Sequence, residues 1–257
     1  MEAYKAQADE VLTVVAGLTD YQKMVAEYFD NKAREVIFFP AVEVNPSTFR
    51  TADFYWLDFM LHIAQFDAGI VTWQEKARYD AVRPITAIQY LYADKTIDTF
   101  NGQTVQGSDW VPYVDQGDHP EYPSATACFC AAQAEAWKLH YGGSDEIRSF
   151  QFPTPAGFVE VLGFTGTFKA GSSPYEPGVT PSAPVTVNYE KWSDYVAECG
   201  ESRIWSGLHF RSAVDASIEM CADVGAQAFA YFGALMDGSA DSPRAPAVQV
   251  RGDLVCR

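Results

Sequence analysis

The segment from about Ala52 to Tyr79 constrains the fold of this chain most, because it predicts one long helix that other helices must cover. Its apolar residues recur at helical spacing on one broad face, at Leu57, Met60, Leu61, Ala64, Ala68 and Val71. Polar residues interrupt the run, namely Asp58, His62, Gln65 and Asp67. A membrane span is nearly uncharged, so we predict no membrane span here and a helix buried within protein.

Helical patterns continue along most of the chain, separated by long loops. Thr19 and Gln22 fit a capping box. The other predicted helices are Tyr21 to Lys32, Pro84 to Asp94, Ala125 to Tyr141, Asn188 to Glu198 with a stop at Gly200, and about Leu208 to Met236. The segments predicted as ordered loops, with short strands or a hairpin, are Lys95 to Tyr122, including the Asn101-Gly102 turn, and Gly163 to Val187. We predict an all-α helical bundle with long ordered loops, forming a single domain over residues 1–257.

Composition and charge exclude several classes of protein. Lys plus Arg number 18 and Asp plus Glu number 34, for a net charge of −16, which disfavours a nucleic-acid partner. The first residues lack the pattern of a signal peptide, so we expect a soluble protein whose compartment stays open. The five cysteines include no CxxC pair, and Cys128 and Cys130 point to different sides of a predicted helix. They indicate packing rather than a shared metal site or a dense disulfide scaffold, and one disulfide pair stays open.

The stretch from His119 to Thr126 predicts an anion-binding helix start. Pro120 and Pro123 favour an extended approach, and Ser124 is a preferred N-cap for the helix that follows. Backbone N–H groups and the positive end of the helix dipole would face a group bound near Ser124. Taken alone, this stretch is more often an ordinary helix cap.

Basic residues elsewhere in the chain could complete such a site. Lys76 and Arg83 are seven residues apart, and Pro84 turns Arg83 away from helical geometry. Arg203 and His209 lie where a turn enters the last predicted helix. Three cations, a capping hydroxyl and a histidine suit a tetrahedral oxyanion, whereas each cation taken singly would be a solvated surface group.

Three separated blocks give the chain a family resemblance. Lys76, six residues and Arg83-Pro84 form the first block; Pro123-Ser124-Ala125-Thr126 the second; Ser202-Arg203, five residues and His209 the third. In order and spacing they resemble the signature of the vanadium-dependent haloperoxidases and the related type 2 phosphatidic acid phosphatases. The resemblance implies a helical bundle that holds vanadate, or phosphate at the same site.

Residue roles follow from the matched positions. The residues that match the family's vanadate-binding positions are Lys76, Arg83, Ser124, Ala125, Arg203 and His209. The resemblance implies that the cations, the hydroxyl and the Ala125 N–H contact the vanadate oxygens, and that His209 is the axial ligand of vanadium. Fixed donors of this kind stabilise a multiply charged anion where water cannot compete.

Two positions depart from the family pattern. Thr126 stands where the family has an acid–base histidine, and a threonine hydroxyl does not titrate near neutral pH. Ala213 stands where the phosphatases place an aspartate, and Asp215 is turned to another side of the helix. We therefore count Thr126 among the catalytic positions, together with His209, and name His119 and Glu121 as candidates to replace the missing acid–base group.

The expected function is oxidation of a halide, with bromide or iodide favoured, by hydrogen peroxide at a vanadate cofactor. One alternative is a soluble acid phosphatase that cleaves a small phosphoester through a phosphohistidine at His209. The other is a non-catalytic protein that binds vanadate or phosphate, an interpretation that Thr126 keeps open. A homo-oligomer is also left open.

Overall fold

A computed structural model describes residues 2–31, 51–147, 150–154, 157–161 and 164–239 of the chain. Its elements in order are α1 (Glu2–Ala16), α2 (Asp20–Asn31), α3 (Thr51–Tyr79), α4 (Pro84–Leu91), β1 (Thr96–Asp98), β2 (Thr104–Gln106), the 3-10 turn η2 (Gly107–Asp109), α5 (Ala125–His140), β3 (Phe150–Thr154), β4 (Gly157–Val161), β5 (Phe164–Phe168), β6 (Val185–Tyr189), α6 (Trp192–Trp205) and α7 (Arg211–Asp237). The chain is mostly helical, as predicted.

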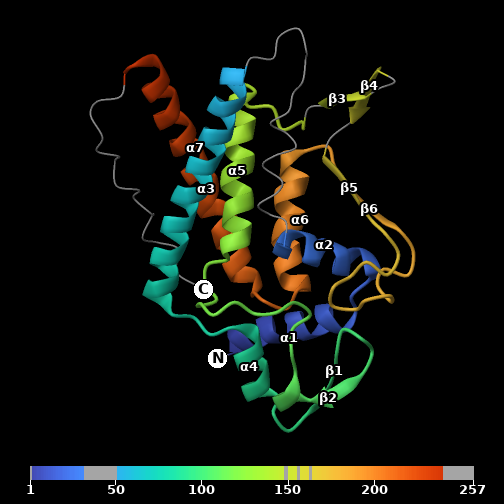
Figure 1. Cartoon of the computed structure of the whole chain (residues 1–257). Coiled ribbons are helices and arrows are strands. Elements are labelled where there is room, and N and C mark those ends of the chain that lie inside the picture. The colour runs from blue at the N-terminus through green and yellow to red at the C-terminus, as the bar shows by residue number, and fades with distance from the viewer. Residues whose placement is uncertain (1, 32–50, 148–149, 155–156, 162–163, 240–257) are drawn as a thin grey trace.

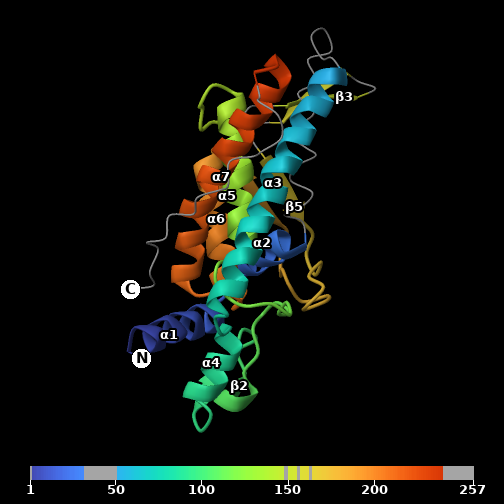
Figure 2. The same cartoon turned by 90° about the vertical axis from the view of Figure 1, so that its left-hand side faces the viewer.

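The long helices stand side by side as a bundle. Figure 1 shows α3, α5, α6 and α7 running along one direction, with α5 in the middle, and the pairwise packing of α5 against the other three agrees with this view. Helix α1 lies across the lower end of the bundle and α4 extends below it, and Figure 2 shows α1 projecting to one side there. Within the described ranges, no helix combines the length and apolarity needed to cross a membrane.

The strands form small antiparallel pairs at the edges of the bundle. Strand β1 pairs with β2, β3 with β4, and β5 with β6. Thr96 lies opposite Gln106, and Gly102 turns the first hairpin with φ +73°, which confirms the predicted Asn101-Gly102 turn. The β5–β6 pair likewise confirms the hairpin that was expected between Gly163 and Val187.

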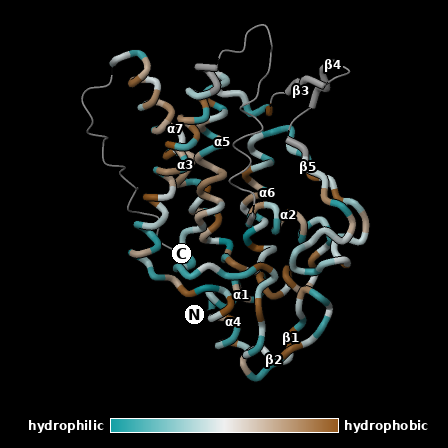
Figure 3. The backbone as a smooth tube through the Cα atoms, viewed as in Figure 1, coloured by the Kyte–Doolittle hydropathy of each residue, from teal (hydrophilic) through white to brown (hydrophobic). Residues whose placement is uncertain are grey.

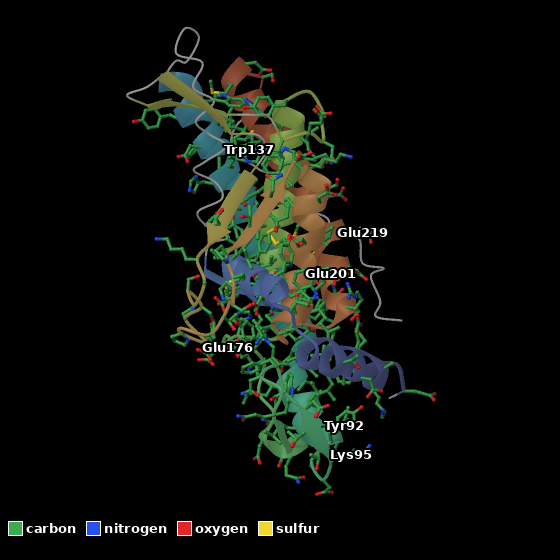
Figure 4. The ribbon with its side chains drawn as sticks, turned by 90° about the vertical axis from the view of Figure 1, so that its right-hand side faces the viewer. Tyr92, Lys95, Trp137, Glu176, Glu201 and Glu219 are labelled. Atoms are coloured by element: carbon green, nitrogen blue, oxygen red, sulfur yellow. A yellow bond between two sulfur atoms is a disulfide. The ribbon has the colours of Figure 1, made fainter. Side chains whose placement is uncertain are left out.

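Buried aromatic side chains fill the bundle. Phe29 and Tyr195 have ring centroids 5.4 Å apart, and Trp137 of α5 stacks on Trp192 of α6 at 5.7 Å. Figure 4 labels Trp137 in the upper part of the bundle, and Tyr92 near the opposite end. The hydropathy colouring in Figure 3 shows hydrophobic residues recurring along the tubes of the bundle helices. The core therefore runs along the bundle, and a further hydrophobic cluster that includes Ile88, Ile204 and Phe210 lies at its lower end beside buried polar residues.

Two disulfides join α5 to its neighbours. Cys128 is bonded to Cys221 of α7, and Cys130 to Cys199 of α6. The two α5 cysteines do point to different sides, as predicted, but each is linked covalently to another helix rather than simply packed. Both bonds hold helices that begin or end at the polar end of the bundle.

Several helix boundaries differ from the predictions for physical reasons. Helix α1 was not predicted, and its buried Ala8, Val11 and Val15 pack into a small core with α4. Asn188 lies in β6, so its assignment as a cap was wrong, and α6 begins at Trp192. Helix α6 also continues through Gly200, where a Cβ atom would lie 2.8 Å from Val214 Cγ1. Gly200 therefore permits close packing against α7 and does not stop the helix.

The other boundaries agree closely. Helix α7 begins at Arg211, a few residues after the expected Leu208, and α4 ends at Leu91 instead of near Asp94. The capping box is confirmed, with Thr19 N donating to Gln22 Oε1 at 3.0 Å and Gln22 N donating to Thr19 Oγ1 at 3.3 Å. The sequence also predicts a loop over residues 40–47 and a surface tail from Ser239 onward. Residues 40–47 and 240–257 lie outside the described residues.

Candidate functional site

The candidate site lies at the lower end of the bundle, where four long helices begin or end. Lys76 is in the last turn of α3, Ser124 caps the N-terminus of α5, and Arg203 is near the end of α6. His209 lies in the turn between α6 and α7. Figure 1 shows these helix ends gathered above α1 and α4. Three blocks that are far apart in the sequence thus meet at one end of the fold.

Arg83 connects these segments. It is the N-cap of α4 in extended geometry, with φ −71° and ψ 154°, because Pro84 occupies the first helical position. Its side chain is buried, and Nε donates to the His119 carbonyl at 3.0 Å. Nη1 donates to the Leu208 carbonyl at 3.0 Å and lies 3.1 Å from His209 Nε2. Arg83 therefore ties the approach to α5 to the turn before α7.

Lys76 is buried against the same approach. Its Nζ donates to the carbonyls of Pro120 at 2.6 Å and Glu121 at 3.1 Å. Burial and the positive charge of Arg83 lower the pKa of Lys76 to about 7, against the opposing effect of Glu121. A nearby anion would raise this pKa and hold the ammonium in its charged form.

Arg203 has buried guanidinium nitrogens that donate no hydrogen bond within the described part of the chain. Only 2% of the residue is exposed, and its Nη2 pairs with Asp30 at 3.1 Å. Its Nε and Nη1 are buried and have no hydrogen-bond partner among the described residues. Burial lowers the pKa of Arg203, and Asp30 partly offsets this effect. Because an unpaired buried donor is costly, these two nitrogens fit a site that is completed by a bound acceptor.

His209 is held between a cation and a carboxylate. Its Nδ1 lies 3.0 Å from Glu121 Oε1, and its Nε2 lies 3.1 Å from Arg83 Nη1. Burial, followed by the charges of Arg83, Lys76 and Arg203, keeps the pKa of His209 well below its usual value. Burial raises the pKa of Glu121 to about 7, against hydrogen bonding from Phe210 N and the nearby cations. His209 is thus a neutral imidazole near neutral pH.

His119 lies beside Arg83 and is half-buried. Its Nδ1 is 3.0 Å from Arg83 Nη2, and its ring lies 5.2 Å from that of Trp73, centroid to centroid. Burial, then Lys76 and Arg83, lower the pKa of His119. This histidine therefore adds an imidazole to the cationic cluster.

Ser124 is the N-cap that was predicted. Its backbone N–H donates to Ser217 Oγ at 2.7 Å, and its own Oγ accepts from Ala127 N at a long 3.5 Å. Ala125 is buried in the first turn of α5, and Thr126 is half-buried beside it. The serine hydroxyl is thus only weakly engaged, which leaves it able to contact a bound group.

The predicted site residues fall into two groups. Lys76, Arg83, His119, Arg203 and His209 are joined by the contacts above and by mutual electrostatic interactions. Ser124, Ala125 and Thr126 lie at the start of α5, and within the described part of the chain no hydrogen bond links their side chains directly to Lys76, Arg83 or Arg203.

Two neighbours of the site were missed in the sequence. They are Asp30, paired with Arg203 across 173 positions, and Trp73, whose ring is tilted by 43° against that of His119. Neither belongs to a motif that could have indicated it. Only the packing of α2 and α3 around the cluster brings them to the site.

A tetrahedral oxyanion with several negative charges fits this arrangement. Three buried cations converge, and two guanidinium nitrogens of Arg203 lack acceptors within the described part of the chain. Bidentate guanidinium and ammonium contacts are the usual means by which proteins hold phosphate-like groups. The donor set therefore suits vanadate or phosphate.

Residues 56–238 match the family model of the VCPO second helical-bundle domain. The chain belongs to the vanadium haloperoxidase family. The similar solved structures include the holo form of a bacterial vanadium-dependent chloroperoxidase, 29% identical with a TM-score of 0.81, which covers 90% of this chain and 48% of that one. The apo form of a bacterial vanadium-dependent chloroperoxidase is also 29% identical, with a TM-score of 0.79, over 91% of this chain and 49% of that one.

A more distant match shows the haloperoxidase fold alone. It is a bacterial vanadium-dependent iodoperoxidase, 18% identical with a TM-score of 0.59, over 87% of this chain and 48% of that one. This vanadium haloperoxidase family member spans about half the length of the solved relatives it matches. Among curated proteins, none matches the chain.

Proposed function

We propose that this protein is a vanadate-dependent haloperoxidase that oxidises a halide with hydrogen peroxide, with bromide or iodide favoured. The observation that carries the proposal is the buried guanidinium of Arg203, with two nitrogens that lack partners among the described residues, in a cluster with Lys76 and Arg83. An oxyanion supplies acceptors for those donors and negative charge for those cations. We propose bromide or iodide because the family's acid–base histidine is replaced by Thr126, and these halides are oxidised more easily than chloride.

Each residue has a proposed role. Lys76, Arg83 and Arg203 would neutralise the vanadate oxygens, and Ser124 Oγ with Ala125 N–H would donate hydrogen bonds to them. His209 would bind the vanadium through Nε2. When bound, vanadate supplies a Lewis-acid centre that activates peroxide.

His119 is the proposed proton carrier of this site. It is half-buried beside Arg83, and its lowered pKa favours a neutral imidazole that can accept a proton near neutral pH. Thr126 cannot take this role, because its hydroxyl does not titrate in that range. We therefore propose that turnover depends on His119.

Two alternative functions would use the same cluster of residues. A phosphatase reaction would use His209 as the nucleophile on a small phosphoester, and the Glu121–His209 pair is the observation that keeps it open. A non-catalytic protein that holds vanadate or phosphate would need the cations but no acid–base group, and Thr126 favours that possibility. A homo-oligomer stays a prediction, which sedimentation over a range of protein concentrations measures.

One experiment separates these functions. The purified protein is loaded with vanadate, freed of excess, and assayed for peroxide-dependent oxidation of iodide, bromide and chloride, and in parallel for hydrolysis of p-nitrophenyl phosphate without vanadate. Oxidation of any halide that disappears in Arg203→Met supports the proposal. Phosphoester hydrolysis without halide oxidation indicates the phosphatase, and retained vanadate with neither reaction indicates the binding protein.

A further inference from the structure

We propose that Glu121 is the positioning residue of His209, holding the Nδ1 proton so that the Nε2 lone pair is directed toward the cationic cluster. This inference rests on the proposed function, because it concerns the atom through which His209 would bind vanadium. It assigns to Glu121 a role different from that of an acid or base acting on the bound group.

The two neighbours of His209 define its tautomer. Arg83 Nη1 lies 3.1 Å from His209 Nε2, and a guanidinium nitrogen can only donate a hydrogen bond. Nε2 must therefore be unprotonated, so a neutral ring carries its proton on Nδ1. That proton meets Glu121 Oε1 at 3.0 Å. Both contacts favour the tautomer in which Nε2 is the electron-pair donor.

Glu121 is itself held firmly on both sides. Its side chain is buried, and Oε1 also accepts a hydrogen bond from Phe210 N at 2.9 Å, one residue after His209. Its backbone N–H donates to the Ala81 carbonyl at 2.9 Å, and its backbone carbonyl accepts from Lys76 Nζ at 3.1 Å. The carboxylate therefore fixes the ring of His209 and the backbone of the adjoining turn together.

The carboxylate that contacts His209 Nδ1 comes from Glu121 in the approach to α5 and not from α7. Ala213, four residues after His209, is buried and its carbonyl accepts a hydrogen bond from Ser217 Oγ at 2.5 Å. Asp215 is exposed on α7, and the charges that act on it are those of Arg211, Glu201 and Glu10. Glu121 reaches the imidazole from the approach to α5, 88 residues away in sequence.

Glu121 acts through the ring and does not touch the bound group. Nδ1 and Nε2 are on opposite sides of the imidazole, and Glu121 Oε1 already accepts from two donors, His209 Nδ1 and Phe210 N. A carboxylate behind a metal-binding histidine raises the basicity of the ligand and fixes its orientation, and its loss typically costs 10–100-fold in metal affinity.

The first test reads the tautomer directly in the vanadate-free protein. The chain has four histidines, so ¹⁵N-histidine labelling gives few imidazole signals, and the His209→Gln variant assigns the one of interest. We expect Nδ1 of His209 to be protonated and Nε2 to be unprotonated at pH 7. A His209 protonated at Nε2, or at both nitrogens, would overturn the proposal. Because no vanadate is needed, this result stands even if the proposed haloperoxidase function fails.

The second test measures the dissociation constant for vanadate by isothermal titration calorimetry. We expect Glu121→Ala to weaken binding about 10–100-fold. Glu121→Gln keeps an acceptor for Nδ1 but removes the charge, so it should fall between Glu121→Ala and the wild type. Asp215→Asn is the matched control and should bind as the wild type does. Equal affinity in all four proteins would refute the role of Glu121, whereas a wild type that binds no vanadate would refute the proposed function instead.

Discussion

Replacing Arg203 with methionine should stabilise the vanadate-free protein while removing its ability to hold vanadate. Arg203 is buried, and two of its guanidinium nitrogens have no acceptor among the described residues. Each unsatisfied buried group costs about 1–3 kcal/mol, so their removal gains roughly 2–6 kcal/mol. The lost bond to Asp30, at 3.1 Å, is worth about 1.5–3 kcal/mol. The balance is a gain on the order of 1–3 kcal/mol, because methionine fills much of the same volume.

Chemical denaturation with and without vanadate measures both effects. At a vanadate concentration 100 times its dissociation constant, the wild type should gain about 2.7 kcal/mol in the free energy of unfolding, and Arg203→Met should gain none. Arg211→Met is the control, since the guanidinium of Arg211 is paired with Glu10 and Glu201 at the edge of the bundle. Arg211→Met should lose stability and keep the gain from vanadate. An Arg203→Met protein that is less stable than the wild type, yet still stabilised by vanadate, would refute this reasoning.

Further predictions concern turnover and the close packing of α5. His119→Ala should lower halide oxidation on the order of 100-fold in a steady-state peroxide assay, because it removes the proposed general acid–base group, and an unchanged rate would mean that another residue supplies it. Gly225→Ala should lower the free energy of unfolding by about 1–3 kcal/mol or more, since its Cβ would lie 2.2 Å from the Ala132 carbonyl oxygen. A denaturation midpoint equal to that of the wild type would contradict the packing of α5 on α7. Replacing both Cys130 and Cys199 with serine opens a loop spanning 69 positions and should lower the free energy of unfolding by about 4 kcal/mol. An unaltered midpoint in the same denaturation assay would contradict this prediction.

The sequence predicted the parts of the fold that depend on local signals. The Thr19–Gln22 capping box, the Ser124 cap and the Asn101-Gly102 turn all formed where their residue types required them. Pro84 likewise turned Arg83 out of the helix and toward the site. In each case the preference belongs to a few adjacent residues, so tertiary packing did not need to be known.

Features that depend on contacts between distant residues could not be predicted in the same way. Gly200 has the local pattern of a helix stop, yet it lies inside α6. A glycine is needed there because Val214 of α7 approaches too closely for a side chain. Glu121 was one of two candidates in the approach to α5, and only the position of His209 Nδ1 distinguishes its role from that of His119. The pairing of the cysteines likewise depends on which helices flank α5.

The retention of vanadate by His209 tests the central claim of this account most directly. The wild type, His209→Ala and the control His62→Ala are loaded with vanadate, desalted, and analysed for vanadium per chain. His62 is a suitable control because it is exposed on α3, where its Nδ1 lies 2.7 Å from the Asp58 carbonyl oxygen. We predict about one vanadium per chain in the wild type and in His62→Ala, and almost none in His209→Ala, because the bond to the metal is lost. Equal retention by all three proteins would contradict the assignment of His209 as a ligand of vanadium.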